Sequence, residues 1–136
     1  MNFSEYQQLA AKTAGMHLNK EIEVKLIALG LDQENARIAA EYFAAEKGLY
    51  VSTLGIAGEA GEFADMIKKQ AGHNHASDPI KEKKELGDIL WYIADVCTKK
   101  GYDMGEVASM NIEKLKARYP EGFSIERSQN RKPGDI

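Results

Sequence analysis

Two pairs of acidic residues stand at three-residue spacing near the middle of the chain. Glu59 and Glu62 form an E-x-x-E, and Glu85 and Asp88 form an E-x-x-D. On a helix this spacing puts both members of a pair on one face, with Cβ atoms about 5–6 Å apart. If the two helices pack antiparallel, four carboxylates converge at one seam. Such an all-oxygen set favours Mg²⁺, Mn²⁺ or Ca²⁺ over zinc.

Repulsion between these carboxylates leaves two interpretations of the pattern. Two unit charges at 4 Å repel by about 4 kcal/mol at an effective dielectric constant near 20. Several such pairs would strain a domain whose whole stability is on the order of 5–15 kcal/mol. Either the carboxylates splay into water, as acids on a solvated helix face do, or a cation binds among them.

Three glycines accompany the first acidic pair. Gly55, Gly58 and Gly61 each disfavour a helix by about 1 kcal/mol relative to alanine. Because they lack side chains, a ligand or a neighbouring backbone can approach closely. This favours the interpretation in which a cation binds among the carboxylates. The chain contains neither G-x-G-x-x-G after a strand nor G-x-x-x-x-G-K-[ST]. The dinucleotide-binding fold and the P-loop are therefore excluded.

Helical periodicity dominates every patterned stretch of the chain. The clearest start signal is Asp78, an N-cap followed by proline. A short polar loop joins the two acidic helices, so we expect them to pack antiparallel. We predict an all-α bundle of about five to six helices. The first predicted helix begins at Ser4 with a Ser4–Gln7 capping box. The second follows Asn19 and ends at Gly30, and the third begins after Asp32 and stops at Gly48. The last three span residues 50–70, 79–100 and 104–119.

Composition narrows the class of protein. The chain has 136 residues, which suits one domain, and a net charge of −3, which argues against a surface that binds nucleic acid polymers. A single cysteine, Cys97, fits a reducing compartment. The chain start resembles no signal peptide, and no apolar run has membrane-spanning length. We expect a cytoplasmic protein with one domain over residues 1–124 and a polar tail over 125–136.

Three segments carry a resemblance to a known family. "LGIAGEAGEFADMIKK", "KEKKELGDILWYIADV" and "NIEKLKARYPEGFS" resemble the MazG-like nucleotide pyrophosphohydrolases, a family of the all-α nucleoside triphosphate pyrophosphohydrolase superfamily. The family signature is E-x-x-E, a spacer, then E-x-x-D, and all four acids match it. The resemblance covers about residues 54–124. Residues 16–48 are interpreted as a helical elaboration atypical of the family.

The resemblance implies an activity, a cofactor and an assembly. The activity is Mg²⁺-dependent hydrolysis of a nucleoside triphosphate between the α- and β-phosphates, with Mn²⁺ able to substitute, giving a monophosphate and pyrophosphate. The four acids would bind the metal and one would act as base, in a homodimer or dimer of dimers. Asn111 and Lys114 would contact phosphate or sugar; otherwise they are surface residues.

Other residues have a functional and an ordinary interpretation. Lys69 can neutralise phosphate or simply complement a helix C-terminus. Trp91 can stack on a base or belong to a core or an interface. Asp95, two turns beyond Asp88 on the same face, can extend the acidic site, but we expect it at the surface. The alternative functions are a relative with a narrower substrate, such as dCTP, dUTP or phosphoribosyl-ATP, and a non-catalytic regulator that binds metal or nucleotide. Two complete acidic pairs favour an enzyme.

Overall fold

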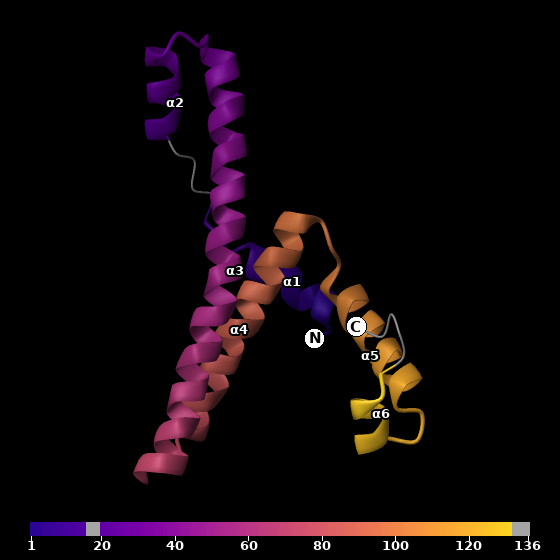
Figure 1. Ribbon diagram of the computed structural model, residues 1–136. Coiled ribbons are helices and arrows are strands. Elements are labelled where there is room, and N and C mark those ends of the chain that lie inside the picture. Colours follow the sequence, from indigo (N-terminus) through magenta and orange to yellow (C-terminus); the bar gives the residue numbers. More distant parts are fainter. Residues whose placement is uncertain (16–19, 132–136) are drawn as a thin grey trace.

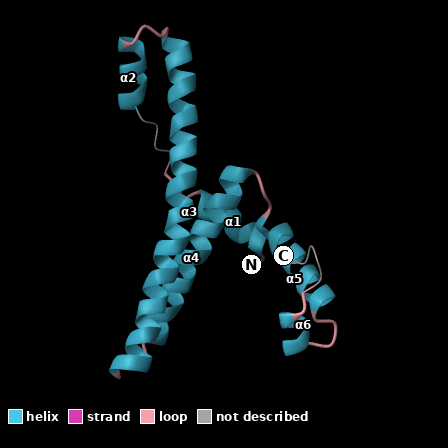
Figure 2. Cartoon of the chain, in the orientation of Figure 1, coloured by secondary structure: helices cyan, strands magenta, loops and turns pink. Residues whose placement is uncertain are grey.

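All regular structure in the computed structural model is helical within the residues it describes, 1–15 and 20–131, as Figures 1 and 2 show. The helices are α1 (Phe3–Ala11), α2 (Lys20–Ala28), α3 (Gln33–His73), α4 (Pro79–Lys100), α5 (Met104–Arg118) and α6 (Ile125–Gln129). The predicted all-α class is confirmed. Residues 16–19 of the predicted elaboration and 132–136 of the predicted tail lie outside the described residues.

An antiparallel hairpin of α3 and α4 forms the centre of the molecule (Figure 1). The short helix α2 lies along the N-terminal half of α3, away from the hairpin. On the other side, α1 crosses α4 and contacts α5. The acidic pairs therefore lie in the two-helix part of the molecule, where α3 and α4 run side by side.

The stop predicted at Gly48 is wrong, because α3 is one continuous helix of 41 residues. Gly48 faces α4, where the side chain of Lys99 crosses it. A Cβ added to Gly48 would lie 3.0 Å from Cε of Lys99, so this glycine allows close packing instead of ending the helix. The helix ends at Asn74, which caps it in the left-handed conformation with φ 56°.

The other helix boundaries mostly follow the predicted capping residues. Asp78 accepts hydrogen bonds from the backbone N–H groups of Ile80 and Lys81, both at 3.1 Å, with Pro79 in the first turn. Gly101 ends α4 with φ 69°. These local signals are confirmed because capping depends on only a few neighbouring residues.

The first helix begins two residues earlier than predicted. Asn2, not Ser4, is its N-cap and forms a capping box with Glu5, with distances of 2.8 and 2.9 Å. The Ser4 hydroxyl instead donates to Asp103 at 3.1 Å. Because Asp103 is itself the N-cap of α5, Ser4 joins α1 to the start of α5.

The core is small. One buried cluster joins α1, α4 and α5, and half-buried side chains pack against it. Its members are Ala10, Ala94, Cys97 and Met104, with Tyr6, Trp91 and Ile93 around them. Ala36 and Ala40 are buried where α2 lies along α3. Among the described residues no large side chain is fully buried, so much apolar surface is left uncovered. No described helix is long and apolar enough to cross a membrane.

Candidate metal and nucleotide site

A single antiparallel register aligns the facing residues of α3 and α4. Each step along α3 towards its C-terminus is matched by an equal step back along α4, and the steps alternate between four and three residues, as in a coiled-coil seam. Contacts between the helices join Gly48 with Lys99, Ser52 with Asp95, and Gly55 with Tyr92. Continued in the same steps, this register aligns Glu59 with Asp88 and Glu62 with Glu85. Both acidic motifs are therefore part of the seam.

Gly55 sets how closely the two helices approach just above the acids. The ring of Tyr92 lies directly on its backbone, and a Cβ at Gly55 would fall 2.3 Å from Cε1 of Tyr92. Gly58 and Gly61 differ, since nothing lies within 4 Å of a Cβ built on either one. Both line a cleft beside the seam. One glycine thus serves packing, and two leave space open.

Three carboxylates converge in the seam. Glu59 from α3 and Glu85 and Asp88 from α4 each offer an oxygen atom, and these oxygens lie within 4.8 Å of one another. Glu62 lies one turn further along α3 and lines the adjoining cleft. Partial desolvation, followed by the charges of Glu62, Asp88 and Glu85, raises the pKa of Glu59. A cation among these oxygens would remove that repulsion.

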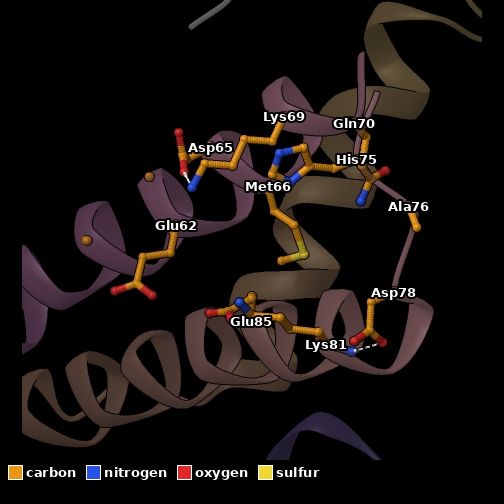
Figure 3. A pocket seen from close by; sticks show the side chains of 12 residues that line it. Glu62, Asp65, Met66, Lys69, Gln70, His75, Ala76, Asp78, Lys81 and Glu85 are labelled. Carbon is orange, nitrogen blue, oxygen red and sulfur yellow. Dashed lines mark hydrogen bonds and ion pairs between the residues drawn. The ribbon is translucent and has the colours of Figure 1, made fainter. Parts of the chain in front are cut away.

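A cleft of about 540 Å³ opens beside the carboxylates, between the C-terminal half of α3 and the start of α4 (Figure 3). Glu62 and Glu85 line one part of it. Towards the loop between the helices lie Lys69, His75 and Lys81. The cleft therefore combines oxygen donors for a cation with groups that can bind phosphate oxygens.

The cations of this cleft are partly engaged already. Asp65 forms ion pairs with Lys68 and with Lys69, the second at 2.6 Å. Hydrogen bonds from these two lysines lower the pKa of Asp65 to about 2. Both pairs are exposed to solvent, so water screens them and Lys69 can exchange Asp65 for another anion at little cost.

The remaining predicted ligands lie away from this cleft. Trp91 packs half-buried against the core, and its indole N–H donates to Thr13 at 2.7 Å. Asn111 and Lys114 lie on α5 with exposed side chains, and neither lines the cleft. A role of these three residues in substrate binding stays a prediction.

Tyr6 is a neighbour of the acids that sequence spacing did not indicate. It lies on α1, and its hydroxyl donates to the backbone oxygen of Gly87 at 3.4 Å. Burial, and then the charge of Asp88, raise the pKa of Tyr6. Because α1 is remote in sequence from α4, only the crossing of the two helices brings Tyr6 to this place.

The expectation that Asp95 lies at the surface is wrong. Its residue is only 4% exposed, and it accepts a hydrogen bond from Ser52 of α3. The heptad position of Asp95, seven residues beyond Asp88, places it in the same seam. Asp95 also pairs with Lys99 of its own helix, whereas Asp88, at the equivalent seam position, is exposed.

Comparisons with known proteins found a family profile and a phage relative. The sequence profile of a family described as "MazG nucleotide pyrophosphohydrolase domain" matches residues 51–123, which include all four acids. The chain is also 32% identical over 89 residues to a protein named "Gene 37 protein" of Mycobacterium phage L5; the aligned part covers 62% of this chain and 78% of the phage protein. No solved structure matches the chain.

Proposed function

The chain belongs to the MazG nucleotide pyrophosphohydrolase family, and we propose that it hydrolyses nucleoside triphosphates between the α- and β-phosphates. The cofactor in this proposal is Mg²⁺, for which Mn²⁺ can substitute, and the products are a nucleoside monophosphate and pyrophosphate. One observation carries the proposal: the convergence of Glu59, Glu85 and Asp88 within 4.8 Å inside the segment that matches the family.

The donor chemistry fits a hard divalent cation. Glu59, Glu85 and Asp88 supply oxygens of the type that Mg²⁺ and Mn²⁺ prefer, and Glu62, which lines the adjoining cleft, would complete the set or bind a water. A bound Mg²⁺ would neutralise phosphate charge and make a water more acidic. One of the four carboxylates would then accept the proton of the attacking water.

The cleft beside the acids supports a place for the phosphate chain. We propose that Lys69, His75 and Lys81 bind phosphate oxygens while Glu62 and Glu85 hold the cation at the other part of the cleft. The lysines would offset the charge of the pyrophosphate as it leaves. Lys69 would leave Asp65 for the substrate, which the exposure of that ion pair permits.

A product panel tests the activity and separates it from the alternatives. All common NTPs and dNTPs are incubated with the protein in Mg²⁺ or EDTA, and monophosphate and pyrophosphate are quantified. The proposal predicts both products, in Mg²⁺ only, and their loss in Glu85→Gln but not in Glu113→Gln, a control on α5 outside the cleft. Turnover of dCTP or dUTP alone would support a narrower enzyme. Binding without turnover would support a regulator.

We also propose that the protein acts as a homodimer or dimer of dimers in the cytoplasm. The N-terminal half of α3 supports the assembly, because Ile38, Tyr42 and Phe43 are 51%, 64% and 50% exposed. Exposed aromatic side chains in such number favour a protein interface. Light scattering at micromolar and nanomolar concentration checks this: a monomer at both, with full activity, would contradict it.

A further inference from the structure

Two polar residues lie buried in the seam above the acidic site. Among the residues that the structure describes, Ser52 and Asp95 are the only polar ones classed as buried, at 3% and 4% exposure. The Ser52 hydroxyl lies 2.5 Å from a carboxylate oxygen of Asp95. Lys99, one turn along α4, forms an ion pair with the same oxygen. The two acidic motifs do not include these residues, so their burial needs another reason.

Burial of a carboxylate is unfavourable unless its partners are held in place. The hydroxyl of Ser52 has one proton and two neighbouring acceptors, since the backbone oxygen of Gly48 lies 2.8 Å away. It can donate to only one of them at a time, and the shorter contact is with Asp95. The side chain of Lys99 passes over Gly48 to reach Asp95, and a Cβ at Gly48 would lie 3.0 Å from its Cε. The glycine therefore leaves room for the lysine that pairs with Asp95.

The contact between the ring of Tyr92 and the backbone of Gly55 already opposes a slip of α3 along α4. The buried polar network adds a second constraint, because its partners must also stay aligned. If α3 slipped by one seam step in either direction, Asp95 would face Gly48 or Gly55 and lose its serine partner. A buried polar contact of this kind is known to specify register in coiled coils.

The same slip would misalign the acids. Ser52 lies seven residues before Glu59, and Asp95 lies seven residues after Asp88, so both pairs occupy equivalent positions one heptad apart. After a slip, Glu59 would face Glu85 or Tyr92 in place of Asp88. The convergence of the oxygens of Glu59, Glu85 and Asp88 within 4.8 Å of one another belongs to the present register, and a slip would change the positions from which they are presented.

We propose that Ser52, Asp95 and Lys99 form a register latch that positions the metal-binding carboxylates of α3 against those of α4. The latch touches neither metal nor substrate, so its members are positioning residues. The inference rests on the metal site of the proposed function, and it adds residues outside that site on which cation affinity depends.

The test measures Mn²⁺ affinity by electron paramagnetic resonance in the protein without nucleotide, with circular dichroism to confirm folding. Ser52→Ala removes the hydroxyl. Its matched control is Thr53→Ala, because Thr53 donates to the backbone oxygen four residues earlier in the same way but is exposed. The latch predicts that Mn²⁺ affinity falls about tenfold in Ser52→Ala, as for other residues that orient metal ligands, and is unchanged in Thr53→Ala.

A second variant separates positioning from simple electrostatics. Lys99→Met removes a positive charge, so an effect of charge alone would strengthen Mn²⁺ binding, whereas loss of the latch predicts weaker binding. Lys100→Met, at the neighbouring exposed lysine, supplies the control. If Ser52→Ala does not fold, the sign of the Lys99→Met effect decides.

Three outcomes would overturn the inference. Ser52→Ala could melt earlier yet bind Mn²⁺ as the parent does, which would make its role merely structural. Lys99→Met could bind Mn²⁺ as tightly as Lys100→Met or more tightly. A parent protein that binds no Mn²⁺ would instead refute the metal site of the proposed function, and the latch with it; the parent's behaviour thus distinguishes the two failures.

Discussion

Gly55→Ala should loosen the contact between α3 and α4 immediately above the acidic site. The added Cβ would lie 2.3 Å from the ring of Tyr92, whereas carbon atoms in contact are about 3.5–4.0 Å apart. The ring or the helix must therefore move by more than about 1 Å. Overpacking of this kind costs about 1–3 kcal/mol, and the better helix propensity of alanine returns only about 1 kcal/mol.

The expected net effect is a loss of up to about 2 kcal/mol in the free energy of unfolding. For a chain of this size that corresponds to a melting temperature lower by up to roughly 8 °C. Thermal melts followed by circular dichroism, without divalent ions, measure it. Gly61→Ala is the matched control on the same helix, because nothing lies within 4 Å of its added Cβ, and its melting temperature should rise. Equal shifts in the two variants would refute the close contact at Gly55.

Three further predictions concern charge. Without metal, the Glu85→Gln variant should be as stable as the parent or slightly more so. Millimolar Mg²⁺ should stabilise the variant less than the parent, because only the folded form presents the assembled site, and the variant should hydrolyse substrate far more slowly. An unchanged Mg²⁺ response in thermal melts would argue against the site. Lys81→Ala should raise KM for the nucleotide more than it lowers kcat, and an unchanged KM in steady-state kinetics would remove Lys81 from phosphate binding. The backbone N–H of Glu106, and then the Ser4 hydroxyl, donate hydrogen bonds to Asp103 and lower its pKa. The ionised Asp103 should therefore stabilise the fold above the pKa of aspartate in the unfolded chain, about 4, and this stabilisation should be lost as pH falls through the pKa of the folded state. Asp103→Asn should therefore flatten the acid side of the stability profile, and an unchanged profile in melts across that range would contradict this.

Local signals in the sequence predicted the helices well. Asp78, Pro79 and Gly101 mark the bounds of α4 because capping involves only neighbouring residues. Gly48 misled the prediction, since a glycine that ends a helix and a glycine that admits a neighbouring side chain look alike in sequence. Only the position of Lys99 on another helix distinguishes the two cases.

The acidic site was predictable in part, because the spacing of its acids along each helix is also a local signal. The spacing of Glu59, Glu85 and Asp88 already places them on helix faces, and a short loop makes those helices antiparallel. The approach of Tyr6 depends on how α1 crosses α4, which no local pattern encodes. Asp95 was expected at the surface, because the sequence places it on the helix face of Asp88 but does not show that Ser52 of α3 and Lys99 pair with it.

Phosphorus NMR of one reaction mixture tests the central claim most directly. The parent protein is incubated with a nucleoside triphosphate that it accepts, in Mg²⁺ or in EDTA, and every phosphorus-containing product is quantified. The acidic seam of α3 and α4 predicts monophosphate and pyrophosphate in equal amounts, no orthophosphate as a primary product, and no reaction in EDTA. A diphosphate with orthophosphate, or turnover that persists in EDTA, would contradict it.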